Sequence, residues 1–365
     1  MSAPRVSIYP ADYEHVEETV ERAFEEHGPP VEGRTVLVKP NILGAMAPER
    51  HVNTHPSLVR ATVAALRRRR AGRILVGDNS GMRAYGSNEQ AARVAGILEA
   101  AGGHYVNLGA SPVAVKVKSD FAAELAFSRE VLEADVLVSL PKMKTHVATL
   151  ITGGIKNAYG HLVGGEKSRL HREAVGPENF ARAVVDVYQV RPPDLAILDA
   201  VVAMEGQGPS GGRPREVGRL LASRSAVALD AVMAAMMGLA PRAVPMLRIA
   251  EARGLGPADL GAIEIEGPFE VVRRFKRPGV GMGLGAFAAR IGTYLLVTRP
   301  RVRAGKCVRC GSCVTACPVG ALTMTDAGPV IDDARCISCF CCHEMCRYNA
   351  MNLAPRMRFL QGLGR

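Results

Sequence analysis

The chain contains no tryptophan, and only 5% of its 365 residues are aromatic. Proteins that bind single-stranded nucleic acid usually stack the bases on aromatic side chains, so this composition argues against that class of protein. The formal net charge of +11 is high, but its densest run, the four arginines at 67–70, closes a predicted helix. Cations complement the dipole at that end of a helix. We therefore expect no nucleic-acid partner.

The sequence also lacks an apolar N-terminal segment of the kind that directs secretion. One apolar stretch, residues 279–297, is long enough to suggest a membrane span, but it holds five glycines and has Arg290 near its middle. A charge at the centre of a bilayer is costly, so we interpret the stretch as a segment buried between domains. These features predict a soluble, cytoplasmic protein that does not bind membranes.

Cysteine is absent from the first 306 residues, and all nine cysteines lie between Cys307 and Cys346. A disulfide framework would spread them through the fold, whereas such crowding is typical of a metal site. The spacing C-x2-C-x2-C-x3-C occurs twice, beginning at Cys307 and again at Cys336, so each cysteine of the first copy has an equivalent 29 residues later. The C-terminal region is therefore an internal duplication.

This spacing predicts two [4Fe–4S] clusters. Three thiolates at x2 intervals wrap one cubane, and the fourth cysteine reaches the other cluster. The segment resembles bacterial two-cluster ferredoxins over roughly residues 301–354. Zinc motifs rarely supply such tandem quartets. The predicted ligands are Cys307, Cys310, Cys313 and Cys346 for one cluster, and Cys336, Cys339, Cys342 and Cys317 for the other.

Two residues depart from the ferredoxin pattern. In the ferredoxin pattern a proline follows the fourth cysteine, and Pro318 fits this pattern in the first copy. In the second copy Arg347 stands at that position. Cys341 is a ninth cysteine with no place among the eight ligands, and we predict a packed, neutral thiol there.

Residues 1–272 alternate between short runs rich in Val, Ile and Leu and amphipathic helical patterns at residues 13–27, 56–70, 88–101 and 178–190. This alternation predicts an α/β domain with a mostly parallel sheet. Residues 273–300 would form a linker or docking segment. Residues 301–365 would form a small α+β ferredoxin-like domain that carries the two clusters.

Polar motifs follow the predicted strands, where α/β folds place their sites. The richest motif begins after the strand that ends near Leu140. We predict that its lysines and histidines bind an anionic substrate, either a carboxylate or a phosphate, and donate a proton to it. As exposed side chains, the lysines would contribute little to folding. Lys142, Lys144 and Asn157 are the candidate binding residues, and His146, His161 and Lys156 are the candidate catalytic residues.

The chain resembles the DUF362 proteins, a widespread family that often carries a C-terminal ferredoxin domain. The matching stretches include LVKPNIL, ADVLVSLPKMKTH, TGGIKNAYGHLVG and LDAVVAMEGQGPSGG, and together the matches span roughly residues 35–240. The resemblance implies the domain arrangement and specifies no reaction.

Two further motifs are weaker. Gly206, Gly208 and Gly211 have the letters of a dinucleotide fingerprint, but no helical pattern opens directly after them. Asp78, Asp199 and Asp230 could hold a divalent cation, although capping of backbone groups at strand ends is the more common role. An organic cofactor is left open.

These observations favour an iron–sulfur oxidoreductase, such as a ferredoxin-dependent reductase. It would receive single electrons from a soluble low-potential carrier of the ferredoxin or flavodoxin type. The electrons would reach a small anionic substrate in the α/β domain. The alternative is an electron-carrier or assembly module whose α/β domain binds a partner protein. A third option is a non-redox enzyme whose clusters serve structure or sensing.

Overall fold

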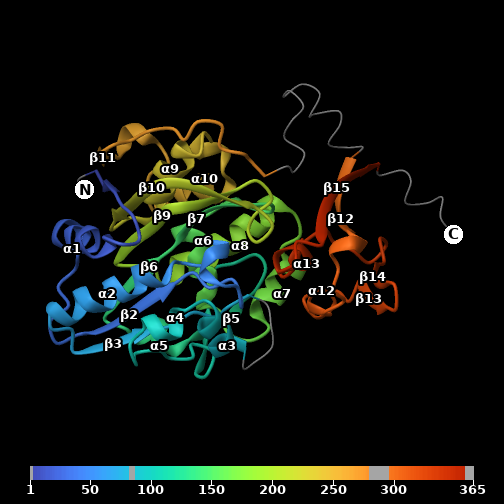
Figure 1. The fold of residues 1–365 in the computed structure, drawn as a ribbon, viewed down its shortest axis with the longest axis horizontal. Coiled ribbons are helices and arrows are strands. Elements are labelled where there is room, and N and C mark those ends of the chain that lie inside the picture. Colours follow the sequence, from blue (N-terminus) through green and yellow to red (C-terminus); the bar gives the residue numbers. More distant parts are fainter. Residues whose placement is uncertain (1–2, 82–86, 279–295, 358–365) are drawn as a thin grey trace.

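A computed structural model describes residues 3–81, 87–278 and 296–357 (Figure 1). The larger part is an α/β domain, and the smaller ferredoxin-like part lies beside it, at the right of Figure 1. Most of the stretch at 279–297, which we interpreted as buried between domains, lies outside the described residues.

The α/β domain is built on a nine-stranded sheet with the order β11-β1-β10-β9-β6-β2-β3, in which β7 pairs with β9 and β8. The pairs β2–β3, β2–β6, β6–β9, β7–β9 and β1–β11 are parallel. The prediction of an α/β domain with a mostly parallel sheet is confirmed, with β10 and β8 as antiparallel exceptions. The strands are β1 Arg5–Pro10, β2 Thr35–Pro40, β3 Arg73–Val76, β6 Val136–Leu140, β7 Lys142–His146, β8 Leu150–Thr152, β9 Leu195–Glu205, β10 Arg213–Ser223 and β11 Glu264–Glu266.

Helices cover both faces of the sheet, and each layer has its own hydrophobic core. The first layer contains α1 Val16–His27, α2 Pro56–Arg68, α3 Ser87–Val94 and α4 Ile97–Ala100. The single helix predicted at 88–101 is two helices, because Gly96 adopts φ +70 between them. The second layer contains α6 Gly154–Asn157, α8 Pro177–Val190, α9 Ala226–Met236 and α10 Pro245–Ala252.

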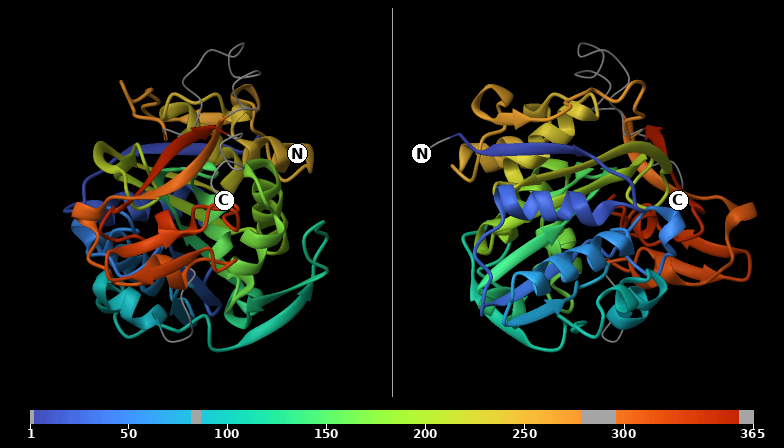
Figure 2. Two further views of the ribbon diagram at one scale, coloured as in Figure 1. Left: turned by 90° about the vertical axis from the view of Figure 1, so that its right-hand side faces the viewer. Right: turned by 60° about the vertical axis from the view of Figure 1, so that its left-hand side comes forward.

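Shorter elements complete this domain. A hairpin of β4 Pro112–Lys116 and β5 Glu124–Ser128 precedes α5 Arg129–Glu133, and α7 Glu166–Glu173 follows the 3-10 turn Ala158–His161. The loop after β2 and strand β7 contact the ferredoxin-like part, which is coloured orange and red in Figure 2.

The ferredoxin-like part repeats one local structure. Its two short helices, α12 Ser312–Thr315 and α13 Cys341–Glu344, are 29 residues apart, and each is preceded by a left-handed residue, Gly311 in one copy and Phe340 in the other. The hairpin β13 Leu322–Thr325 and β14 Gly328–Ile331 lies on the far side, while α13 faces the α/β domain (Figure 1). The strands β12 Leu296–Val302 and β15 Met351–Met357 pair antiparallel.

Candidate functional site

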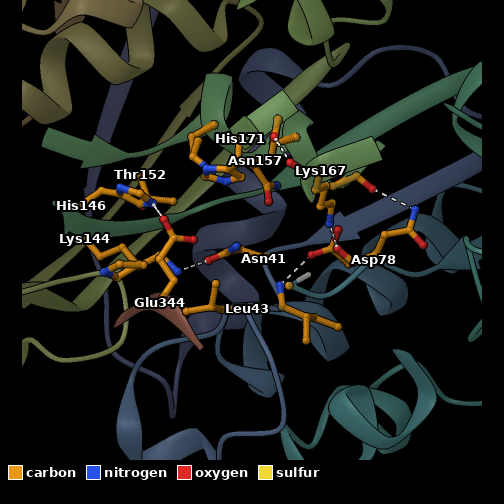
Figure 3. Close-up of a pocket in the computed structure, with 17 residues that line it drawn as sticks. Asn41, Leu43, Asp78, Lys144, His146, Thr152, Asn157, Lys167, His171 and Glu344 are labelled. Carbon is orange, nitrogen blue, oxygen red and sulfur yellow. Dashed lines mark hydrogen bonds and ion pairs between the residues drawn. The ribbon is translucent and has the colours of Figure 1, made fainter. Parts of the chain in front are cut away.

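A pocket lies between the two parts of the protein, where the loops after β2 and β3, strand β7 and helix α6 meet helix α13 (Figure 3). Only Glu344 comes from the ferredoxin-like part among the described lining residues. The charged, imidazole and amide groups of the lining belong to Asn41, Asp78, Asn79, Lys144, His146, Lys156, Asn157, Lys167, His171 and Glu344.

Three lysines dominate the charge of this pocket, and we call Lys144, Lys156 and Lys167 the pocket lysines. Lys144 donates to Asn41 Oδ1 at 2.7 Å and to the carbonyl oxygen of Val52 at 2.9 Å. Burial lowers the pKa of Lys144 to about 7. Lys167 donates to the carbonyl oxygen of Asn79, and burial lowers its pKa to about 7 as well.

Lys156 is held by aromatic rings. Its ammonium lies 4.4 Å from the ring centroid of Tyr159 and 5.3 Å from that of Phe180, within cation–π range. Burial lowers the pKa of Lys156, against the opposing effect of Glu344.

The two carboxylates of the lining are engaged elsewhere. Asp78 forms a buried ion pair with Lys39 at 2.7 Å, and Glu344 faces His146 at 3.1 Å. In the described parts of the chain, no carboxylate lies within ion-pairing distance of a pocket lysine. The pocket lysines therefore have no directly paired carboxylate, which leaves their ammonium groups available to a bound anion.

The Lys39–Asp78 pair forms the floor of the pocket and depends on a glycine. A Cβ at Gly160 would overlap Asp78 Oδ1 and come within 2.7 Å of Lys39 Nζ. Lys39 also donates to Asn157 Oδ1 at 3.0 Å, and Asn157 in turn donates to Ser139 Oγ at 2.9 Å. This network fixes Asn157 with its amide at the pocket wall.

His146 connects the two parts of the protein. Its Nδ1 accepts the backbone N–H of Ala148 at 3.1 Å, so Nε2 carries the proton and points at Glu344. Burial lowers the pKa of His146, although Glu344 opposes this shift. Burial alone would raise the pKa of Glu344, but His146, Lys156 and His171 hold it well below its usual range. Glu344 is therefore an ionised carboxylate at the pocket wall.

Of the six residues predicted from the motif that follows the strand ending near Leu140, four line this pocket: Lys144, His146, Lys156 and Asn157. The other two do not. Lys142 is fully buried away from the pocket, where it donates to Asp199 at 2.8 Å and to the hydroxyl of Tyr13 at 2.9 Å.

His161 is also buried outside the lining, and burial together with the nearby Lys39 lowers its pKa well below the usual value. A histidine held neutral and away from the pocket is poorly placed to donate a proton there. The expectation that Lys142 and His161 share the pocket is wrong, because both side chains are buried outside its lining.

The lysines are not exposed, contrary to the sequence-based expectation. Lys142 is 0% exposed and Lys144 is 1% exposed. Replacing Lys142 would leave Asp199 as a buried, unpaired charge, which costs about 3–5 kcal/mol. The expectation that such variants fold normally is therefore wrong for Lys142.

Three charged residues of the lining, Lys167, Asp78 and Glu344, were not assigned to the substrate site from the sequence. Lys167 lies in α7, outside any strand-end motif, and Asp78 was considered only as a cap or cation ligand. Glu344 comes from the other domain, and one signal was available for it: its equivalent 29 residues earlier is Thr315. A residue that is charged in one copy and uncharged in the other marks a position where the two copies differ in role.

The cysteines of the predicted first cluster lie together. Cys307, Cys310, Cys313 and Cys346 line one apolar pocket beside the hairpin residues Met324 and Pro329. The fourth of these comes from the second copy, as cross-ligation requires. Four thiols around one apolar pocket are a donor set that fits a cubane.

The remaining cysteines gather around Cys342. Burial raises the pKa of Cys342, and the neighbouring Cys339, Cys336, Cys313 and Cys317 raise it further. Three of these four neighbours are the partners expected for the second cluster.

Cys341 is 0% exposed and lies beside Cys339, and burial raises its pKa well above the usual value. These surroundings are consistent with a packed, neutral thiol.

The loop with the letters of a dinucleotide fingerprint contacts the ferredoxin-like part. His343 Nε2 lies 3.2 Å from the carbonyl oxygen of Gln207, Ser210 Oγ donates to the carbonyl oxygen of His343 at 3.2 Å, and Asn349 donates to that of Gly211 at 3.3 Å. The loop is an interdomain contact, which explains its glycines without a nucleotide.

Asp199, within strand β9, and Asp230, within helix α9, bind groups of the protein itself. Asp230 accepts the backbone N–H groups of Gly154 and Ile155 at 2.6 and 2.9 Å, and Asp199 accepts from Lys142 and Tyr13. Burial raises the pKa of Asp230 to about 7. These contacts favour the structural role over a cation site.

Fold and site together define an α/β protein whose C-terminal ferredoxin-like module closes a cationic pocket. The family model of the domain of unknown function DUF362 matches residues 36–235, and that of the 4Fe-4S binding domain matches residues 300–323. The chain belongs to the DUF362 family and carries a C-terminal 4Fe–4S electron-transfer domain. It is similar to the thylakoid-associated protein sll1697 of Synechocystis, with 36% identity over 68% of this chain and 78% of that protein.

Two solved structures are distantly similar. One is a protein from Thermotoga maritima, with 14% identity and a TM-score of 0.41 over 60% of this chain. The other is the lactate racemase apoprotein from Thermoanaerobacterium thermosaccharolyticum, with 12% identity and a TM-score of 0.43 over 65% of this chain. The matches span 56% and 57% of those two chains, respectively.

The helices of the described residues are all too short or too polar to cross a membrane.

Proposed function

We propose that this protein is an iron–sulfur oxidoreductase that delivers single electrons to a small anionic substrate held in the pocket between its two parts. Cys307, Cys310, Cys313 and Cys346 would hold one [4Fe–4S] cluster, and Cys336, Cys339, Cys342 and Cys317 would hold a second. When bound, the clusters would supply one-electron reducing equivalents. The proposed compartment is the cytoplasm.

One observation carries this proposal. The pocket is cationic on the α/β side, and its opposite wall is Glu344, the last residue of α13, two positions after Cys342 and two before Cys346. A substrate bound by the pocket lysines would therefore lie against the segment that supplies cysteines to the second cluster. A partner-binding module has no need of a buried cationic pocket at this place.

The residues of the chain would do three things for such a substrate. The pocket lysines would bind and orient its negative charge through charge-assisted hydrogen bonds. Lys144 and Lys167, each with a pKa of about 7, could release a proton to a reduced substrate near neutral pH. The apposed ferredoxin-like part would exclude water, which strengthens each electrostatic contact.

The test is reoxidation of the reduced protein by candidate substrates. Anaerobically prepared protein is reduced with dithionite, freed of excess reductant and mixed with a panel of small carboxylates and phosphate esters. The proposal expects one compound class to restore the oxidised visible spectrum with saturation.

The control compares two lysines. Lys156→Met should weaken the apparent affinity for that compound about 10- to 100-fold, the value of one charge-assisted contact. Lys116→Met, on the exposed strand β4, should leave it unchanged. Reoxidation that is linear in concentration and equal in both variants would favour the electron-carrier alternative.

A further inference from the structure

The two copies of the cysteine motif differ in what surrounds them. Residues 301–310, which lead into and begin the first copy, contain four basic residues and no acidic residue. Within this segment Val308 is an exposed apolar side chain, 55% accessible, and Tyr348 beside the same cysteine pocket is 43% accessible. We call the surface formed by Arg301, Arg303, Lys306, Val308, Arg309 and Tyr348 the basic face.

The residues of the basic face belong to one short segment and to the pocket that this segment lines. Arg301 and Arg303 lie two residues apart at the end of β12, so they project to the same side. Val308, Arg309 and Tyr348 line the pocket of the first cysteine set, which brings the basic segment and the second copy's tyrosine together. Arg309 donates to the backbone carbonyl oxygen of Asp326 at 2.7 Å.

The equivalent segment of the second copy, residues 330–339, carries Asp332, Asp333 and a single arginine, so it lacks the positive charge of the first. In the second copy, Cys342, His343 and Glu344 are at most 5% exposed and face the α/β domain. Phe340 packs there against Val147. A soluble protein can therefore approach Cys310 of the first set, which is exposed, whereas in the second set Cys342 is buried and Cys336, Cys339 and Cys317 are only partly exposed.

We propose that the basic face is the docking site of an acidic one-electron carrier protein, with Val308 and Tyr348 as its apolar centre. This inference rests on the proposed function, which requires an external source of electrons. In the complex the carrier loses one electron and this protein gains one, and no covalent bond forms or breaks. Complementary charge steers such encounters, and an apolar centre ringed by charge is the usual composition of a transient interface.

The test measures binding, without substrate and without turnover, so its result is separate from that of the proposed function. The full-length protein, loaded with iron and sulfide, is titrated calorimetrically with an acidic two-cluster ferredoxin, both proteins being oxidised. Raising the ionic strength from about 50 to about 500 mM should weaken binding at least tenfold, since exposed charges are screened. Cytochrome c, a basic carrier, should not bind.

Matched charge reversals locate the site. The double variant Lys306→Glu/Arg309→Glu should weaken ferredoxin binding at least tenfold. The control Arg67→Glu/Arg73→Glu makes the same change in net charge at α2 and β3, at the opposite end of the molecule (Figure 1), and should stay within about twofold.

Three results would overturn the proposal. The first is no binding of the acidic ferredoxin at low ionic strength. The second is equal weakening in both double variants. The third is tighter binding of a DNA duplex than of the ferredoxin at the same salt concentration, lost in Lys306→Glu/Arg309→Glu, which would make the face a nucleic-acid site.

Discussion

The two copies of the cysteine motif share a backbone and differ in surroundings. Arg309 and its equivalent Ser338 both have a left-handed φ, near +54 and +53, as do Gly311 and Phe340. Yet Cys310 is exposed and Cys313 partly exposed, whereas their equivalents Cys339 and Cys342 are partly exposed and buried, respectively. One repeated loop thus serves two environments, one open to solvent and one against the pocket.

The side chains that differ between the copies explain this asymmetry. Val314 corresponds to His343, which reaches the carbonyl oxygen of Gln207. Thr315 corresponds to Glu344, which faces His146, and Gly311 corresponds to Phe340, which packs on Val147. The cysteines preserve the metal site while the residues between them decide which copy docks on the α/β domain.

The largest effect is expected from replacing Cys317 or Cys346, each of which would bind the cluster of the other copy. Cys346→Ser should remove the cluster of the first triad, and Cys317→Ser that of the second, because each removes one of four ligands. Each variant should keep about four of about eight iron atoms per chain. Iron and sulfide analysis with electron paramagnetic resonance measures this. Loss of the cluster in the variant's own copy instead would show that the ligands are not crossed.

The second prediction tests the docked copy. Phe340→Gly removes a buried ring but relieves a left-handed conformation, so the free energy of unfolding should fall by about 2–3 kcal/mol. Thermal and denaturant unfolding measure this. Val330→Ala, which truncates a side chain 56% exposed in the same domain, should change stability by less than about 0.5 kcal/mol. Equal effects would mean that Phe340 does not hold the copy in place.

The third prediction concerns pH, and sulfate is the probe because its charge is constant over the range used. Lys144 and Lys167 lose their charge as pH rises through about 7. Loss of one charge-assisted contact should weaken sulfate binding about tenfold or more between pH 6 and 9. His146 and His171 have lowered pKa values and should stay neutral there, and Glu344 should stay ionised.

Calorimetry at each pH gives the sulfate affinity, and Lys144→Met should show a shallower dependence on pH.

The same lysines also affect how stability depends on pH. The pKa of each lysine is lower in the folded protein than in the unfolded chain. The free energy of unfolding should therefore fall as pH falls from about 10.4 to about 7. A sulfate affinity that is flat from pH 6 to 9 would show that these lysines do not bind the anion.

The smallest effect is expected at the ninth cysteine. Cys341→Ser replaces a buried thiol by the residue that its equivalent Ser312 already is. The iron content and the visible spectrum should therefore stay at the wild-type values. Loss of four iron atoms in this variant would make Cys341 a ligand.

Much of the fold could be predicted from the sequence because its signals are local. Apolar runs marked five of the nine strands, β1, β2, β3, β6 and β9, and periodicity marked α1, α2 and α8 to within three residues. The strand β10 was not predicted, and its antiparallel direction depends on its pairing with the distant β1 and β9. Gly96 was overlooked as the break between two helices.

The site was predictable only in part, for a related reason. Lys144, His146, Lys156 and Asn157 belong to one motif after one strand, so their shared pocket follows from the topology of the sheet. Lys142 and Lys144 have the same local pattern, and only a carboxylate 57 residues away, Asp199, distinguishes them. Glu344 belongs to the other domain, so no sequence pattern within the α/β domain predicts its place in the pocket.

The most direct test of the central claim is the kinetics of iron release from the reconstituted protein in an excess of ferricyanide and chelator. The account predicts about eight iron atoms per chain, released in two phases of about four each. The fast phase belongs to the exposed first set, and Phe340→Gly should accelerate only the slow phase. Release of all iron in a single phase would contradict the claim that the two copies have unlike environments, and stoichiometric zinc with little sulfide would contradict the clusters themselves.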